Sequence, residues 1–253
     1  MIIWNLTMRK FLSFCYLLTI CTFPFLCVDT YASESHAELI INRQIINHRF
    51  GLHAIGIHLT IDGKEVPSPK MIKDEINIFL TSYPNQEDYW EIVNKKLVIY
   101  LANKYSSIEQ MQSIFSVEPD LIKPFNRKSI VSLKNQQVER EAFLFTIANQ
   151  TIQNDLASIE VEMEYKPEVT VSDYINFFAV KDAIQAYFRE NSSLNASEFD
   201  LSERLAKHLL TIFPNVQSFG ISLNRAFDSN DSANYLWKTK VFHSDLDLNK
   251  FLE

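Results

Sequence analysis

The chain has 253 residues, 47% of them hydrophobic, and a formal net charge of −7. This composition is typical of a globular protein that is large enough for one large domain or two small ones. The acidic balance argues against nucleic acid as a partner, because phosphate binding needs a basic face. With four glycines and neither a GxGxxG nor a GxxxxGK(S/T) segment, the sequence also lacks the common glycine-rich phosphate loops.

Residues 1–32 have the pattern of a signal peptide. A basic pair precedes an apolar run from Phe11 to Leu26, and small residues around Ala32 offer a cleavage site. We therefore expect an exported protein, periplasmic or secreted, whose mature chain begins between Ser33 and Glu38. An uncleaved membrane anchor is the alternative, but the run is short for a spanning helix. After removal of the signal, no membrane span is expected.

All three cysteines lie in or beside this segment, at Cys15, Cys21 and Cys27. The mature protein would therefore use no disulfide, no thiol chemistry and no cysteine-based zinc site. Lipidation of Cys27 is a weaker alternative, because Phe25 and Leu26 stand where small residues are expected.

The first half of the mature chain predicts the order strand, strand, helix, helix, strand, strand. Isoleucine-rich alternation indicates the first strands, Pro67 and Pro69 mark the entry to a helix, and Tyr83-Pro84-Asn85 breaks it. The expected strands cover 39–46, 54–61, 108–117 and 130–133, and the helices begin near Met71 and cover 89–104. The same order is expected again in the second half, with strands 142–147, 158–165, 216–223 and 235–242 and helices 174–188 and 199–213. In the strand 158–165, three glutamates alternate with apolar residues, which we interpret as a solvated sheet face.

The helix predicted at 199–213 has the clearest pattern in the chain. Its apolar stripe consists of Leu201, Leu205, Leu209 and Ile212. Asp200 is the expected N-cap, with Glu203 as its partner in a capping box. Phe213-Pro214 is expected to end the helix.

The two halves also align by residue, which indicates an internal duplication. Leu97 matches Leu205, Leu101 matches Leu209, and Lys95 takes the position of Glu203. The predicted fold class is therefore α+β, with two tandem domains that each pack a pair of helices on one face of an antiparallel sheet. The predicted boundaries are 38–125 and 129–243, followed by a C-terminal tail at 244–253.

The second half resembles a known family over residues 158–225. The segment Phe199-x-Leu201-x-Glu203-x-Leu205-Ala206, the helix end at Phe213-Pro214 and the alternation of Ile221 and Leu223 resemble the C-terminal part of dihydroneopterin aldolases. Thr170 to Tyr174 resembles the Thr-Val-x-Tyr element of that family, with one extra residue. The resemblance implies the tunnelling fold, in which such sheets join edge to edge around a central tunnel. The tandem arrangement resembles that of urate oxidases.

By this resemblance, Glu203 would anchor the amide and amino edge of a pterin or purine. A carboxylate suits that role because it accepts two parallel N–H bonds. Tyr174 would offer a face for ring stacking, and Arg225, which stands with Ala226 at the family's Lys-Pro position, is the third candidate ligand-binding residue. For Glu203 a purely capping role is the alternative, and for Tyr174 that of an ordinary aromatic residue at a helix start. Since Lys95 occupies the matching position, the first half lacks the anchor, and at most one such site per chain is expected.

The sequence departs from the aldolase pattern where the chemistry is carried. The expected loop from Asn149 to Ala157 has none of the family's His, Gly or Glu residues, and Arg225 cannot shuttle protons as a lysine can. The fold therefore does not bring aldolase activity with it. No catalytic residue, cofactor or metal is predicted. His48, His53 and His58 lie near the first hairpin, but the sequence shows no carboxylate partner for them.

Two functions are consistent with these observations. The first is an exported protein that binds a flat nitrogen heterocycle through Glu203, and the second is a non-catalytic structural or interaction protein that keeps only the scaffold. In either case we expect a homodimer or a larger even oligomer, because unpaired sheet edges favour association. A monomer with its edges covered by residues 235–253 is the competing expectation.

Overall fold

The structure is a computed structural model that describes residues 35–48, 51–84, 87–120, 124–152, 155–167, 169–191, 196–225 and 237–245. Its strands are β1 (His36–Asn47), β2 (Leu52–Gly63), β3 (Ile108–Val117), β4 (Arg127–Lys134), β5 (Gln137–Ile152), β6 (Asp155–Tyr165), β7 (Val216–Arg225) and β8 (Trp237–Phe242). Its helices are α2 (Pro69–Ser82), α3 (Trp90–Lys104), α4 (Phe177–Glu190) and α5 (Glu198–Ile212). The predicted signal peptide and residues 246–253 of the predicted tail lie outside the described residues. No helix in the described ranges is long and apolar enough to cross a membrane.

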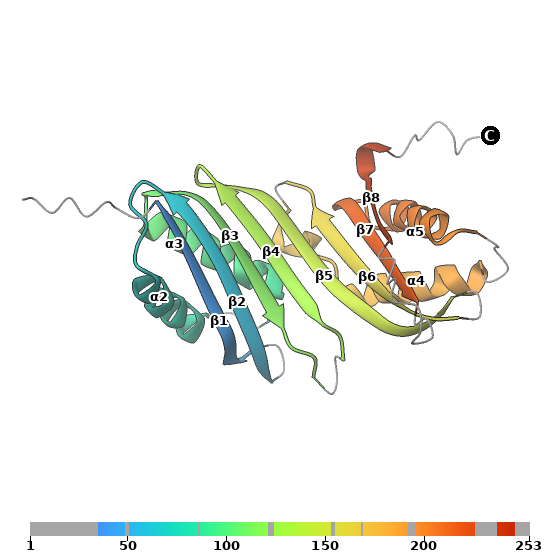
Figure 1. Cartoon of the computed structure of the whole chain (residues 1–253), viewed down its shortest axis with the longest axis horizontal. Helices are drawn as coiled ribbons and strands as arrows, with labels where there is room; N and C mark the ends of the chain where they lie inside the picture. The colour runs from blue at the N-terminus through green and yellow to red at the C-terminus, as the bar shows by residue number, and fades with distance from the viewer. Residues whose placement is uncertain are drawn as a thin grey trace, which may run out of the picture. The chain divides into compact units, whose positions relative to one another are not determined.

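The strands form one eight-stranded antiparallel sheet in the order β1 to β8 (Figure 1). The sequence predicted a separate sheet for each half, but β4 pairs with β5 along its whole length. The two strands are joined by a two-residue turn at Asn135 and Gln136, both with positive φ, which suits the twist of a tight hairpin. The α+β class is confirmed, and the two expected sheets are one.

All four helices pack on the same face of this sheet (Figure 1). The pair α2 and α3 covers β1 and β3 to β5, and the pair α4 and α5 covers β5, β7 and β8. Alternate strand residues point toward the helices, as the period of two requires. Ile57, Leu59 and Ile61 of β2 are fully buried, as are Val161 and Met163 of β6.

Serine or asparagine side chains cap the starts of α2, α4 and α5, whereas α3 begins after Tyr89 without a side-chain cap. Ser68 accepts a hydrogen bond from the Met71 amide at the start of α2, where Pro69 occupies the first turn. The cap of α5 is Ser197, which accepts from the Asp200 amide at 3.1 Å. The predicted capping box of Asp200 and Glu203 is therefore wrong, because the helix begins one turn earlier.

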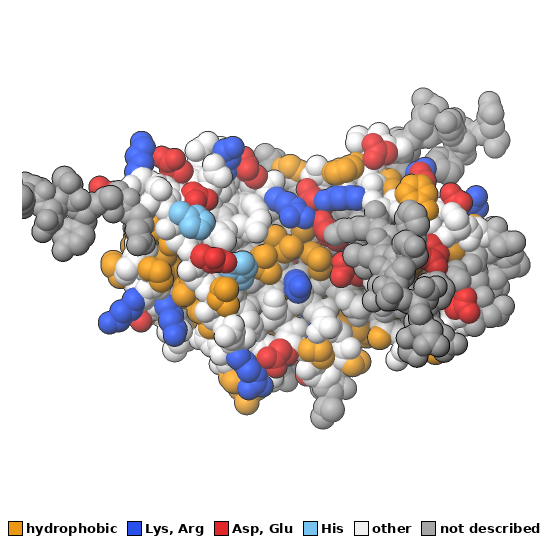
Figure 2. Space-filling model, viewed as in Figure 1, with side chains coloured by type: hydrophobic (Ala, Val, Ile, Leu, Met, Phe, Trp, Pro, Cys, Tyr) orange, Lys and Arg blue, Asp and Glu red, His pale blue; other side chains and the backbone are white. Residues whose placement is uncertain are grey.

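On the face of the sheet that carries no helices, the side chains of β6 are less exposed to solvent than predicted. Glu162 is 5% exposed, and its Oε1 lies 2.6 Å from an Arg140 nitrogen and 3.1 Å from Lys240 Nζ. Glu164 contacts the same two cations at 3.3 and 2.6 Å. Figure 2 shows acidic and basic side chains side by side on this face. The interpretation as a solvated face is corrected for Glu162 and Glu164, which form an ion-pair network across β5, β6 and β8, while Glu160 is partly exposed.

The first prediction concerns a buried amide that joins α3 to the sheet. Asn94 has no exposed surface, and its Nδ2 donates to the carbonyls of Ser113 and Ser129 at 3.2 and 3.1 Å. We expect Asn94→Ala to lower the free energy of unfolding by about 1–3 kcal/mol, since it leaves buried acceptors without this donor. Urea denaturation of the purified protein measures the loss.

The matched control is Ser202→Ala, at the position of α5 that the predicted duplication aligns with Asn94. Ser202 is equally buried, but its Oγ makes no hydrogen bond within the described part of the chain. Because this hydroxyl has no described hydrogen bond to lose, we expect the change to lower the free energy of unfolding by less than about 0.5 kcal/mol. Equal losses from the two variants would contradict the role given to the Asn94 amide.

Candidate functional site

A charged cluster lies where the two halves of the sheet meet. Lys95 of α3 reaches across to Glu141 of β5, and the Nζ–Oε2 distance is 2.9 Å. Tyr174 donates its hydroxyl hydrogen to the other carboxylate oxygen of Glu141, and Lys95 Nζ lies 3.4 Å from the Tyr174 oxygen. We call Lys95, Glu141 and Tyr174 the inner-junction triad. It connects the helix pair of the first half to the sheet and loop of the second half.

Tyr174 is held by the segment that precedes α4. Thr170 and Asp173 form a capping box, in which Asp173 accepts from the Thr170 amide at 2.7 Å. Asn215 donates to the other oxygen of Asp173 at 3.2 Å and so fixes this turn to the start of β7. The sequence placed Tyr174 inside a helix, whereas α4 begins at Phe177. Its ring is buried against Tyr165, with centroids 5.0 Å apart.

Further ionisable groups surround the triad. The Tyr165 hydroxyl donates to Glu91 of α3 at 3.2 Å, and Arg127 of β4 lies near enough to Glu91 to interact with it electrostatically. Burial raises the pKa of Tyr165 and Tyr174, and the nearby carboxylates raise both further. Burial also lowers the pKa of Arg127, which Asp120 and Glu91 partly oppose. Opposite charges therefore compensate one another where the two halves of the sheet meet.

The geometry of the triad favours a structural role over a chemical one. The Tyr174 hydroxyl is bound to a carboxylate and keeps its proton at neutral pH, so it is a poor proton donor to a substrate. The adjoining cavity, lined by Lys95, Glu141 and Tyr165, measures about 40 Å³. That volume holds about one water molecule. Beside Lys95, the protein's own side chains therefore fill the space that a ligand would need.

Glu203 lies in a different environment on α5. Its side chain is 36% exposed, and Lys207, one turn further along the helix, lies 2.6 Å from its Oε1. None of the described contacts joins Glu203 to Tyr174, so the structure does not bring these two predicted site residues together within one chain. Glu203 is bound to a half-exposed cation on its own helix and remains accessible.

The other sequence-predicted positions are resolved as follows. Arg225 ends β7 and pairs with Ala157 of β6, and its side chain lies outside the described residues. The expected loop from Asn149 to Ala157 is mostly strand, because β5 runs to Ile152 and β6 starts at Asp155. Hydrogen bonds along two strands, with a bulge after Ile147, replace the loop that the sequence suggested.

The three histidines near the first hairpin do not converge. His48 and His53 both pack against Trp90, while His58 contacts Glu38 on the helix-free face at 2.7 Å. In the part of the chain that the structure describes, no group of three His, Asp, Glu or Cys side chains could hold a metal ion.

Glu141 is the residue that sequence reasoning missed. It shares its side of β5 with Phe143 and Phe145, which are buried against the helices, and is itself 5% exposed. A charge at an inward position of an otherwise apolar strand is a signal of a buried ionic partner. That signal was present in the sequence, but the strand was expected to begin only at Ala142.

The two helices that carry Lys95 and Glu203 differ in what lies beyond them. The helix α3 packs on β3 and β4 and also reaches β5, the next strand. The helix α5 packs on β7 and β8, and β8 is the last strand of the sheet. Lys95 therefore faces an inner junction that the chain itself completes, and Glu203 belongs to an outer junction at a sheet edge.

The fold is shared with urate oxidases. Urate oxidase from Bacillus sp. TB-90 aligns with a TM-score of 0.57 at 11% identity, covering 83% of this chain and 98% of that one. Urate oxidase from Bacillus subtilis 168 gives 0.57 at 11%, covering 83% and 96%. A uricase from Bacillus fastidious gives 0.60 at 13%, covering 83% and 89%. The sequence matches no protein-family model and no curated protein.

At these identities the similarity shows the fold alone, which is the tunnelling fold. The resemblance to that fold, inferred from the second half of the sequence, is confirmed.

The second prediction tests the inner-junction triad. Lys95→Met removes the cation and leaves Glu141 buried, so we expect the free energy of unfolding to fall by about 2–4 kcal/mol. The matched control is Lys207→Met, which breaks the half-exposed pair with Glu203 and should cost less than about 1 kcal/mol. The double variant Lys95→Met, Glu141→Gln should recover part of the loss. Chemical denaturation measures all three, and equal effects of the two lysine changes would contradict a buried ion pair at the junction.

Proposed function

We propose that the protein is an exported binding protein for a flat nitrogen heterocycle of purine or pterin type, and that Glu203 holds the polar edge of the ring. The proposal takes the two halves, which repeat the same element order, as tandem copies of one domain. The observation that carries it is the contrast between two equivalent positions. Lys95 forms an ion pair with Glu141, which also accepts a hydrogen bond from Tyr174, so this position leaves no room for a ligand. Glu203 is half-exposed at a sheet edge. The shared fold with urate oxidases supports a purine-sized ligand.

A second copy of the chain would complete this site. The edge strand β1 exposes Ile40 and Ile45, and the opposite edge strand β8 exposes Phe242. If β1 of a second copy pairs with β8, it takes the place beside α5 that β5 takes beside α3. The bulges of β1 and β5 align Ile41 with Ile147, which places Ser35 where Glu141 stands. No carboxylate would then oppose Glu203, and its oxygens could accept N–H groups from the ligand.

The ligand would displace the Lys207 ammonium group from the Glu203 carboxylate. Separating a half-exposed ion pair costs little, typically less than about 1 kcal/mol, and two N–H bonds to a carboxylate from an amide and amino edge offset that cost. Tyr174 takes no part in this arrangement, because its hydroxyl and ring are used at the inner junction. Arg225 remains a predicted contact. No catalytic step is proposed, since the sequence lacks the aldolase acid–base groups.

The competing function is a scaffold protein that binds no small molecule. The ion pair of Glu203 with Lys207 favours it, because the carboxylate already has a partner. Measured binding separates the two functions.

The third prediction is that the purified protein binds urate or neopterin in equilibrium dialysis. Glu203→Gln should weaken that binding at least about tenfold, because an amide replaces one acceptor oxygen by a donor. The control is Glu190→Gln at the exposed end of α4, which should leave the affinity unchanged. No binding of either heterocycle, or equal affinity of the two variants, would favour the scaffold function.

The fourth prediction concerns assembly. Light scattering should give the mass of two chains or a larger even number. Ile40→Asp, which places a charge on the 59% exposed edge position of β1, should shift the mass toward one chain. Ile99→Asp changes an exposed isoleucine on α3 and should leave the mass unchanged. A one-chain mass of the unmodified protein over a wide concentration range would reject the two-copy site.

The fifth prediction concerns export. Cells that express the full chain should yield a mature protein whose first residue lies between Ser33 and Glu38, because the segment before it has the pattern of a cleaved signal. N-terminal sequencing of protein from the cell envelope or medium measures this. An intact Met1 or Met8 would overturn the export proposal.

A further inference from the structure

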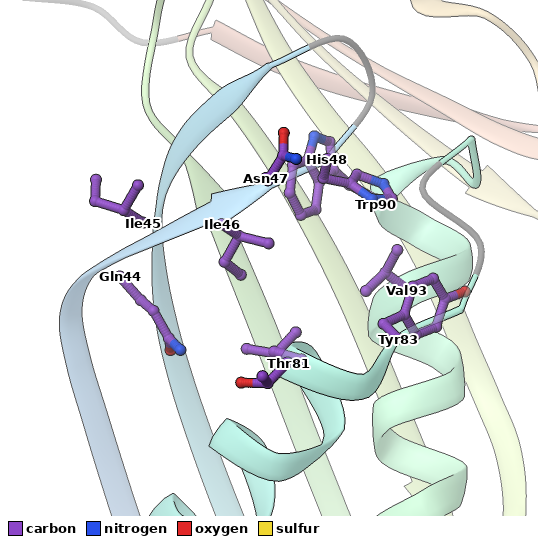
Figure 3. A pocket seen from close by; sticks show the side chains of 10 residues that line it. Gln44, Ile45, Ile46, Asn47, His48, Thr81, Tyr83, Trp90 and Val93 are labelled. Atoms are coloured by element: carbon purple, nitrogen blue, oxygen red, sulfur yellow. The ribbon is translucent and has the colours of Figure 1, made fainter.

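We infer that a cavity in the first half, between β1 and the helices α2 and α3, binds a small uncharged aromatic molecule that carries a ring N–H and has about the size of indole. The inference is independent of the heterocycle proposed at Glu203, because it rests on other residues in the other half of the chain. Figure 3 shows the cavity with the side chains that line it.

The cavity measures about 260 Å³. In Figure 3, Ile46 points from β1 into the space toward Val93 of α3, while Ile45 points away from it. Leu80, near the end of α2, completes the apolar part of the lining. A cavity of about 150 Å³ is enough to hold benzene, so a volume of about 260 Å³ has room for two fused rings.

Aromatic side chains form one wall. The His48 and Trp90 rings lie 4.5 Å apart at 53°, and the Tyr83 ring lies 6.3 Å from His48. His48 is fixed by a 2.7 Å contact between its Nε2 and the Asp88 carbonyl, and His53 packs edge-on against Trp90. A wall of fixed rings at these angles favours a flat aromatic partner, which can lie edge-to-face against it.

The lining excludes a charged ligand. Apart from His48, the described residues that line the cavity include neither acids nor bases. The nearby Asp88 is already compensated, since it accepts from the Tyr83 hydroxyl and lies 2.7 Å from Lys96 Nζ. A carboxylate or ammonium group in the cavity would lose hydration without gaining an opposite charge among the described lining residues.

One polar group marks where the ligand is held. Gln44 Nε2 donates to Asn77 of α2 at 3.2 Å, while its Oε1 is buried and accepts no hydrogen bond within the described part of the chain. The equivalent pair in the second half is reversed, because there Gln150 Oε1 accepts from Gln185 Nε2 at 3.1 Å. The amide oxygen at this position therefore accepts a hydrogen bond in the second half, at Gln150, but not in the first half, at Gln44. Buried acceptors are rarely left unpaired, and a ring N–H would complete this one.

The experiment titrates indole into the protein purified from cells that express the full chain and follows methyl NMR signals of Ile46 and Val93. We expect saturable shifts with a dissociation constant below about 1 mM, in keeping with the efficiency of small ligands. 1-Methylindole, which lacks the N–H, should bind about fivefold more weakly or worse, the effect of one lost hydrogen bond.

Two variants test the position and the polar contact. Val93→Phe fills the space and should abolish the saturable shifts. Gln44→Met removes the acceptor with little change in volume and should bring the affinity for indole down to that for 1-methylindole. Gln150→Met is the matched control in the second half and should leave the affinity unchanged.

Absence of saturable shifts in the unmodified protein would overturn the inference even if a variant fails to fold. Equal affinities for indole and 1-methylindole in the unmodified protein would overturn the role of Gln44.

Discussion

The hydrogen-bonded pairing of β4 with β5 is the constraint on which the rest of the structure depends. It turns two half-sheets into one continuous sheet through a two-residue turn at Asn135 and Gln136. Positive φ at two residues other than glycine is unfavourable, and contacts to the neighbouring strand offset this cost. The Asn135 amide donates to the Glu109 carbonyl at 2.8 Å, and Gln136 Nε2 donates to the Ile108 carbonyl at 3.2 Å. The turn is therefore fixed against β3 as well as between its own strands.

This register decides which side chains enter the seam. A slip of one residue would move every side chain of β5 to the other face of the sheet. Phe143 and Phe145 would then leave the core, and Glu141 would leave Lys95. A buried ion pair adds little net stability compared with apolar residues of the same size, but a mispaired one is strongly unfavourable. We interpret the inner-junction triad as a device that specifies the register and, through it, the position of the second helix pair.

The sequence predicted the fold well because the strongest signals are local. Alternation gave β3 its observed bounds, Ile108–Val117, and the leucine stripe located α5, although Ile212 proved exposed. The predictions failed where tertiary contacts decide. Met71 was expected inside and is exposed, and Tyr174 was placed in a helix although its hydroxyl bonds to Glu141 on a strand 33 residues away. No local pattern encodes the partner of a buried charge, so the triad could not be located from spacing alone.

The residue types and positions of the candidate site could be predicted from the sequence, but their surroundings could not. The sequence predicted that Lys95 and Glu203 are equivalent positions, and the structure shows that their helices differ in what lies beyond them. An inner junction is covered by the strand that follows in the same chain, so its contents can be optimised as part of the core. The outer junction has no following strand in the described part of the chain, so none of the described strands covers it as β5 covers the inner one. A carboxylate at the inner position would meet Glu141 across the seam, and two buried like charges are costly. Lysine at the inner position and glutamate at the outer one are therefore what this geometry requires if only the outer junction is to accept N–H groups from a ligand.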